Sequence, residues 1–202
     1  EIHTVEHLLA ALSGLGIDNV EISVNGGEIP IGDGSALPFV ELLKNEIITQ
    51  DKPEKVFKIK EPCWVSLDDK HIVVLPSNEL RITYTIDFDH KVVGAQFASF
   101  VMTKEVFERE IAAARTFGFL SEVEALHAQG LARGGSLENA IVIGEDKILN
   151  DSLRFENELV RHKILDLIGD FSLIGMSILG HIIAIKSGHD LNLRLVQKII
   201  SS

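Results

Sequence analysis

The sequence has little of several features that would assign a chain to a particular class of protein. One residue in 202 is a cysteine, Cys63, which excludes an intrachain disulfide and fits a reducing compartment. No stretch reaches the roughly 18 apolar residues that a membrane helix needs. The nearest candidate, residues 164–185, is interrupted by Asp166, Asp170 and His181. No signal-peptide pattern occurs, so no membrane span or export is expected.

Positive charge is also scarce. The net charge is -11, and lysine and arginine form no run, so we expect no nucleic-acid partner. A small anionic ligand remains compatible with this charge, because a few local cations can outweigh the net sign. Glycine spacings of the Rossmann or Walker type are absent. With 46% hydrophobic residues the chain is expected to fold around a real core and not to be disordered.

The hydrophobic pattern predicts helices and strands in mixed clusters. Thr4 is expected to cap the first helix, which ends near Gly14. Further helices are predicted over residues 38–45, 104–114, 121–129, 156–174 and 191–200. Strands are predicted over residues 19–24, 56–59, 63–67, 71–75, 80–88, 140–143 and 182–185. Because these elements do not alternate regularly, the sequence favours an α+β fold over a doubly wound parallel sheet.

The sharpest chemical signal is the pair His162 and Asp166. Residues at i and i+4 lie on one helix face, so this imidazole and this carboxylate are able to share a metal ion. A salt bridge or an exposed polar stripe explains the same spacing, and ion-pair networks produce such clusters too. On spacing alone, both interpretations stay open.

Glu6 and His7, in the first turn of the first helix, form a second candidate. Each is ordinary there alone, since a glutamate is stabilised at a helix N-terminus and a lone histidine is commonly an incidental surface residue. Together with His162 and Asp166, however, His7 completes two histidines and one carboxylate, the ligand set of a catalytic zinc site. Glu6 would then be placed to take a proton from a water molecule.

Two weaker signals complete the set. His189 follows a predicted strand and a glycine, which suits a catalytic residue, although a turn histidine is the plainer interpretation. Asp170, one turn beyond Asp166, would orient His189 and raise its pKa. Thr116, beside Phe117 and near a glycine, would hydrogen-bond an oxyanion, or would simply form a corner at a helix end.

A family resemblance goes further than these spacings. A set of short strings occurs in one order along the chain: TVEHL, GIDN, EIPIGDGSA, RTFGF, GGS, RFE, RHKILD and KSGH. Together they closely resemble the bacterial UDP-3-O-acyl-N-acetylglucosamine deacetylases over essentially the whole chain. The resemblance implies two similar α+β domains, each a mixed sheet layer packed on helices, with the active site between them. Residues 1–52 would be the remainder of the first domain and residues 56–202 the second.

The resemblance also implies roles for individual residues. His7, His162 and Asp166 would bind Zn2+, although ferrous iron suits the same ligands. Glu6 would be the general base and Thr116 the donor to the oxyanion. His189 would protonate the leaving amine or stabilise the charged transition state, with Asp170 as its partner.

The implied substrate is a UDP-linked acylated glucosamine, and the implied reaction is its deacetylation in lipid A biosynthesis. Phe88 would pack on the uracil, and Lys163 and Lys70 would meet the diphosphate. Phe117 and Phe119 would begin an inserted segment, residues 117–142, that forms a passage for the acyl chain. A monomeric enzyme in the cytoplasm is expected.

The chain also departs from the family pattern. The family has a further segment before TVEHL that completes the first domain, and we expect the natural N-terminus upstream of Glu1. Asp190 follows His189 where the family often has alanine. Some relatives carry a fused C-terminal dehydratase. A fragment that binds the nucleotide lipid without turnover, and a metal amidohydrolase acting on another acylated sugar, therefore stay open as alternatives.

Overall fold

The computed structural model describes residues 2–122 and 134–201. Its helices are α1 (Glu6–Leu15), α2 (Leu37–Leu43), α3 (Lys104–Val106), α5 (Glu158–Ser172) and α6 (His189–Ile200), with a π-helical stretch η1 (Phe107–Ile111). Its strands are β1 (Val56–Lys58), β2 (Cys63–Leu67), β3 (Lys70–Leu75), β4 (Leu80–Asp87), β5 (Ala95–Val101), β6 (Phe117–Phe119), β7 (Ile141–Ile143) and β8 (Ser177–Ile185). Most of the helix predicted over residues 121–129 lies outside the described residues.

The main sheet is mixed, and β8 is its centre. β4 lies parallel to β8 on one side. On the other side β1 pairs in parallel with the start of β8, and β3 pairs antiparallel with the rest. β2 and β5 are the two edges. Side chains alternate along a strand, so Ile178, Ile182 and Ala184 of β8 all point to the buried face.

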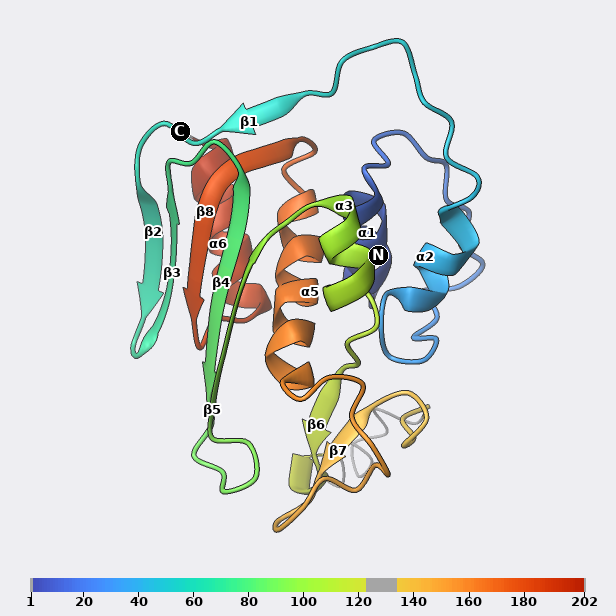
Figure 1. Ribbon diagram of the computed structural model, residues 1–202, viewed down its shortest axis with the longest axis vertical. Coiled ribbons are helices and arrows are strands. Elements are labelled where there is room, and N and C mark those ends of the chain that lie inside the picture. Colours follow the sequence, from blue (N-terminus) through green and yellow to red (C-terminus); the bar gives the residue numbers. More distant parts are fainter. Residues whose placement is uncertain (1, 123–133, 202) are drawn as a thin grey trace.

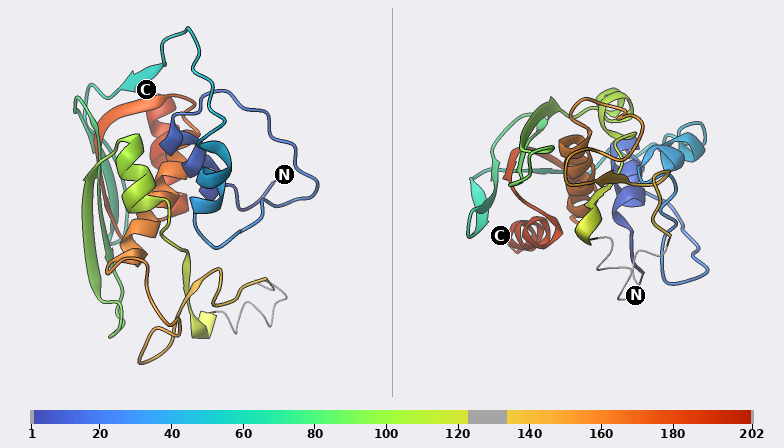
Figure 2. Two further views of the ribbon diagram at one scale, coloured as in Figure 1. Left: turned by 45° about the vertical axis from the view of Figure 1, so that its right-hand side comes forward. Right: turned by 90° about the horizontal axis from the view of Figure 1, so that it is seen from below.

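The helices cover that buried face in two layers (Figures 1 and 2). α5 runs between the sheet and α1, and α2 lies on the far side of α1. Leu159, Leu165 and Leu167 of α5 are 0–1% exposed, because this helix is enclosed on all sides. Ala10 and Ala11 of α1 belong to the same hydrophobic cluster, so the N-terminal part shares a core with the rest.

A close approach of two backbones sets the distance between α1 and α5. A Cβ atom built on Gly169 of α5 would lie 2.3 Å from the backbone oxygen of Glu6 in α1. No side chain fits in that space, so glycine lets the first turn of α1 touch the middle of α5. This contact brings the sequence neighbours Glu6 and His7 against the polar face of α5.

The two-stranded sheet of β6 and β7 lies beyond the N-terminal end of α5 (Figure 1). Its strands pair in parallel, with Phe117 opposite Ile141 and Phe119 opposite Ile143. Ile141 and Ile143 are buried, whereas Phe117 and Phe119 are partly exposed. Two aromatic rings are thereby presented at the end of the helix that carries His162.

The α+β class predicted from the sequence is confirmed, since helices pack on a mixed sheet. The division into two similar domains, residues 1–52 and 56–202, stays a prediction. Strands β5 and β6 were not predicted. Within the part of the chain that the structure describes, no helix is long and apolar enough to cross a membrane.

Two local predictions are wrong. Residues 19–24 are irregular, and Val20 and Ile22 are 49% and 46% exposed, because no described strand pairs with this segment. The Thr4 side chain does not cap α1. Its hydroxyl donates to Glu28 Oε1, its φ is +57°, and Val5 occupies the N-cap position instead.

Candidate metal centre

Three buried side chains from α1 and α5 converge on one point. His7, His162 and Asp166 are 3%, 2% and 4% exposed. One ligand atom from each lies within 4.8 Å of the other two. His162 Nε2 is 3.2 Å from Asp166 Oδ1, and His7 Nε2 is 3.8 Å from the same oxygen. The two imidazole rings meet edge to face at 85°, so both nitrogens address a common space.

The hydrogen bonds around His162 define which nitrogen is available to a ligand. Nδ1 of His162 lies 3.0 Å from the backbone oxygen of Ala114, and a carbonyl oxygen can only accept a hydrogen bond. Nδ1 therefore carries the proton in a neutral ring, and Nε2 presents its lone pair toward Asp166. This arrangement of a histidine fixed by a carbonyl is the usual support of a metal-binding imidazole.

The electrostatics keep His7 and Asp166 in the protonation states that bind a metal ion. Burial, followed by the charge of His162, lowers the pKa of His7 to about 4, so its ring is neutral at pH 7. Burial alone would raise the pKa of Asp166, but His162 and Lys163 outweigh it and hold the pKa well below its usual range. A neutral His7 ring and the Asp166 carboxylate thus face His162 Nε2 across one buried space, an arrangement that suits a cation.

His7 has one further property that hydrogen bonding does not explain. Its Nδ1 atom is buried and has no hydrogen-bond partner among the residues that the structure describes. Buried polar atoms are nearly always paired. No hydrogen bond from Nδ1 to a described residue therefore holds this ring, and its other nitrogen, Nε2, is the one that faces Asp166 Oδ1 at 3.8 Å. The three residues fit a zinc ion in type, number and burial.

His189 approaches the same point from the start of α6. Its Nε2 is 3.9 Å from Asp166 Oδ2, and its Nδ1 is 3.0 Å from Asp170 Oδ2. The hydrogen bond with Asp170, aided by the charge of Asp166, raises the pKa of His189 to about 9. The predicted pairing of His189 with Asp170 is present, and His189 is 47% exposed on its side chain, so a ligand can reach it.

A buried asparagine completes this pair and was missed from the sequence. Asn192, 1% exposed, donates from Nδ2 to Asp170 Oδ2 at 2.8 Å. Its Oδ1 accepts a hydrogen bond from the Ser187 hydroxyl at 2.7 Å. Asn192 follows His189 by three residues on α6, so it lies on the same helix face. That spacing was the signal that could have found it.

Glu6 and Thr116 are linked to the three converging side chains through their neighbours in the chain. Glu6 directly precedes His7 in the first turn of α1. Burial alone would lower the pKa of Lys163, but nearby carboxylates outweigh it and raise this pKa. Asp166 contributes most to the rise, and Glu6 is among the weaker contributors. Thr116 N donates to Gly34 O at 2.7 Å, and Thr116 O accepts from Ile141 N at 2.8 Å. Thr116 thus has a fixed backbone two residues beyond the Ala114 carbonyl that holds His162.

Aromatic rings form a wall beside His162. The Phe117 ring lies 6.4 Å from the His162 ring and 5.9 Å from that of Phe88. Phe88 also contacts Phe119, with ring centroids 5.4 Å apart. Lys163 lies over Phe117 at 5.6 Å and forms an ion pair with Asp166 at 2.7 Å. These side chains, predicted as substrate-binding residues, are brought together.

Lys70 lies elsewhere. It is exposed and begins β3, opposite Leu67 in the β2–β3 hairpin. The next residue, His71, pairs with Ile185 at the end of β8, shortly before His189. Lys70 thus lies at the end of the sheet from which the chain continues to His189. Within the described ranges, 2–122 and 134–201, no hydrogen bond or ion pair joins it to the other predicted residues.

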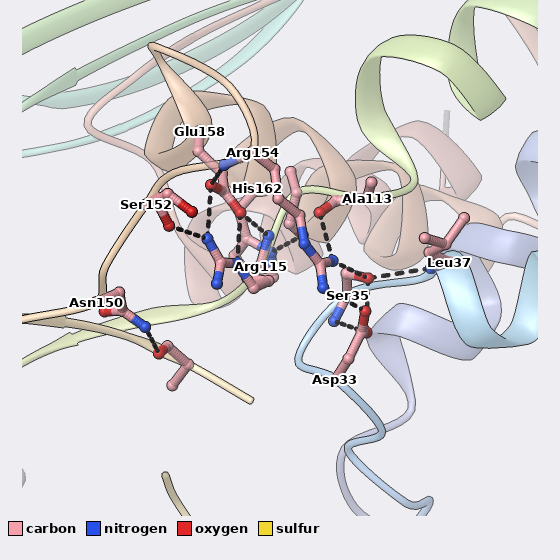
Figure 3. A network of polar contacts seen from close by, with 12 residues as sticks. Asp33, Ser35, Leu37, Ala113, Arg115, Asn150, Ser152, Arg154, Glu158 and His162 are labelled. Atoms are coloured by element: carbon pink, nitrogen blue, oxygen red, sulfur yellow. Dashed lines mark hydrogen bonds and ion pairs between the residues drawn. The ribbon is translucent and has the colours of Figure 1, made fainter. Parts of the chain in front are cut away.

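A buried network of charges supports the segment that runs from Ala113 to Thr116 (Figure 3). Glu158 is fully buried, and its Oε1 accepts from the backbone nitrogen and from Nε of Arg115 at 3.0 and 2.9 Å. Its Oε2 accepts from Arg115 Nη2 at 3.1 Å and from Arg154 N at 2.6 Å. Sequence reasoning missed these residues as part of the site, because they do not touch the converging side chains themselves.

Replacing Glu158 with glutamine is expected to lower the free energy of unfolding by about 3–5 kcal/mol, because Arg115 would lose its buried counter-ion. Burial alone would raise the pKa of Glu158, but hydrogen bonds from Arg115 and Arg154 outweigh it and lower the pKa below 4.5. The stabilisation that ionised Glu158 gives to the folded protein is therefore complete above pH 4.5, and it is lost as the pH falls through the lowered pKa of Glu158. Urea unfolding of both proteins between pH 3 and 7 measures this. A difference in stability that grows toward low pH would contradict the assignment.

Comparisons with known proteins agree with this geometry. The family model described as UDP-3-O-acyl N-acetylglycosamine deacetylase matches residues 1–201. The chain belongs to this family. A curated deacetylase of Syntrophotalea carbinolica is 51% identical over 100% of the chain and 66% of its own length. Family members named UDP-3-O-acyl-N-acetylglucosamine deacetylase from Oleidesulfovibrio alaskensis and Myxococcus xanthus are 54% and 50% identical over 95% and 99% of the chain.

The chain spans 63–66% of the length of these first relatives, or about two thirds. Membership of the deacetylase family confirms the resemblance seen in the sequence.

Proposed function

We propose that this chain catalyses the zinc-dependent deacetylation of UDP-3-O-acyl-N-acetylglucosamine, a step of lipid A biosynthesis, as a monomer in the cytoplasm. The observation that carries the proposal is the convergence of His7, His162 and Asp166, buried and within 4.8 Å of one another, in a chain of the deacetylase family. Two histidines and one carboxylate leave a coordination position open, which distinguishes catalytic zinc sites from structural ones.

The side chains around that point divide the chemistry between them. When bound, zinc supplies a Lewis acid that polarises a carbonyl group and makes water more acidic. Glu6 takes a proton from the attacking water, and the Thr116 hydroxyl donates a hydrogen bond to the oxyanion that develops. His189 then gives its proton to the leaving amine. The products are acetate and the free amine of the sugar.

The pKa values support these roles. His189, with a pKa raised to about 9 by Asp170, carries a proton at pH 7 and is able to donate it. His7, with its pKa lowered to about 4, stays neutral and able to bind a metal. Burial and charge thus separate two histidines that have the same intrinsic pKa into a donor of protons and a ligand.

The aromatic wall supports the choice of substrate. We propose that Phe88 packs on the uracil, that Phe117 and Phe119 begin the passage for the acyl chain, and that Lys163 and Lys70 meet the diphosphate. Burial alone would lower the pKa of Lys163, but the nearby carboxylates, Asp166 above all, outweigh it and keep the ammonium charged, as contact with a phosphate requires. The part of the passage over residues 123–133 lies outside the described residues.

Bound zinc is the first test. Elemental analysis of the purified protein is expected to give close to one zinc per chain, and His162→Ala is expected to lose most of it, because one of three protein ligands is removed. His181→Ala is a matched control, since this histidine hydrogen-bonds Thr83 on the main sheet. Wild-type protein without stoichiometric metal would contradict the proposed centre.

Acetate release from UDP-3-O-acyl-N-acetylglucosamine is the second measurement on the same samples. Release by the wild type and none by His162→Ala is the expected result. Zinc without acetate release would contradict turnover and favour a chain that binds the nucleotide lipid. Release from other acylated sugars at an equal rate would favour a broader amidohydrolase.

A further inference from the structure

Arg154 joins two parts of the chain that are far apart in sequence. Its Nη2 atom lies 2.8 Å from Asp33 Oδ2, and its Nη1 donates to Ser35 Oγ at 3.3 Å. The same Nη1 donates to the backbone oxygen of Ala113 at 2.9 Å. One guanidinium therefore ties the loop around Asp33 to the segment from Ala113 to Thr116 (Figure 3).

Glu158 holds the same segment from the other side. Its carboxylate receives the Arg115 backbone nitrogen as well as the Arg115 guanidinium, so both the main chain and the side chain of Arg115 are fixed. Arg154 N also donates to this carboxylate. The residues on either side of Ala114 are thus each bound to the Arg154–Glu158 pair.

The group held between these two anchors is the Ala114 carbonyl, which receives Nδ1 of His162. A shift of this carbonyl would free the ring to rotate or to exchange its tautomer. Two residues later, Thr116 N donates to Gly34 O, in the loop that Arg154 binds through Asp33 and Ser35. The network therefore ends on two groups of the candidate centre, His162 and Thr116.

We propose that Arg154 and Glu158 are positioning residues of this centre. They fix the Ala114 carbonyl so that His162 keeps its proton on Nδ1 and its Nε2 lone pair toward Asp166. The inference rests on the proposed metal role of His162. Groups that orient a ligating histidine contribute about 10–100-fold to metal affinity, and we expect an effect of that size here.

The variant that tests the inference is Arg154→Met, which keeps the length of the side chain and removes its hydrogen bonds. The Arg154 side chain is 32% exposed, so this change is compatible with folding. Arg161→Met is a matched control. Arg161 also donates to a backbone oxygen and to a carboxylate, both of Glu110, at 2.9 and 2.7 Å, but it does not bind residues 113–116.

The first measurement is the zinc dissociation constant, determined by competition with a chelator. Arg154→Met is expected to bind zinc about 10–100-fold more weakly than wild type. The zinc dissociation constant of Arg161→Met is expected to stay within about threefold of the wild-type value, even where its thermal stability falls as much as that of Arg154→Met. Equal zinc affinity in all three proteins would overturn the inference, as would an equal loss in both variants.

The second measurement does not need a metal. Nitrogen chemical shifts of His162 in metal-free protein are expected to report a proton on Nδ1 in wild type and in Arg161→Met. In Arg154→Met they are expected to shift toward the other tautomer or an average. An unchanged Nδ1 tautomer in Arg154→Met would overturn the inference.

These two measurements separate the inference from the proposed function. A chain that binds zinc and releases no acetate would contradict the function and leave the effect of Arg154 on zinc affinity in place. A chain without a zinc site would still show the tautomer effect. If Arg154→Met does not fold, Asp33→Asn takes its place, because it weakens the same ion pair from the other end. It is expected to give a smaller loss of zinc affinity and a smaller change in the His162 tautomer. The absence of both effects would overturn the inference.

Discussion

Acetate release is expected to fall by about 10²–10⁴-fold when Glu6 is replaced with glutamine, the range that a positioned general base contributes. The amide has the size of the carboxylate but cannot accept the proton of the attacking water. Because Glu6 is not among the three converging ligands, bound zinc and the thermal midpoint are expected to stay at their wild-type values. Rates and zinc content are measured on the same preparations.

Glu41→Gln is the matched control for this change. Glu41 pairs with Lys44 on the surface of α2, and its replacement is expected to leave the rate unchanged. A Glu6→Gln protein that keeps more than about a tenth of the wild-type rate would show that another group takes the proton. A large loss of zinc in Glu6→Gln would instead assign Glu6 to metal binding.

A single methyl group on Gly169 is expected to damage the whole centre. The added Cβ would lie 2.3 Å from the Glu6 oxygen, so α1 must move away from α5. Overpacking of this kind costs about 1–3 kcal/mol. Because His7 moves with α1 while His162 and Asp166 stay on α5, zinc affinity is expected to fall with stability. Urea unfolding and chelator competition measure the two effects.

Gly27→Ala is the matched control for Gly169→Ala, because a Cβ on Gly27 meets no atom within 4 Å. It is expected to leave both zinc affinity and stability near wild type. A Gly169→Ala protein with wild-type zinc affinity would mean that α1 and α5 tolerate separation, and that the position of His7 does not depend on this contact.

The sequence predicted the half of the candidate centre that lies on one helix. His162 and Asp166 are neighbours on α5 through the periodicity of a helix alone, and the predicted helix over residues 156–174 covers the whole of α5. The placement of His7 beside them depends on the packing of α1 across Gly169, a tertiary contact that spacing does not encode. His7 was a candidate only because it completes a zinc ligand set with His162 and Asp166, and the family resemblance implied the same role.

Groups without a side-chain signature were not predictable. The Ala114 carbonyl that holds His162 is a backbone group. Its position depends on Arg115 and on Arg154 and Glu158, which lie in a segment far from Arg115 in sequence. The strand predicted over residues 19–24 failed for a related reason. Alternating apolar residues would give a strand one apolar face, but a strand also needs a neighbouring strand to pair with its backbone hydrogen-bonding groups.

The close contact of α1 with α5 has a consequence for how the fold is held together. A metal ion bound by His7 and His162 would join the first helix of the chain to one near its end, closing a long loop in a protein with a single cysteine. Such a link stabilises the folded state by an amount that grows with free zinc. The availability of the ion would then govern the anchoring of the N-terminal helix as well as the chemistry.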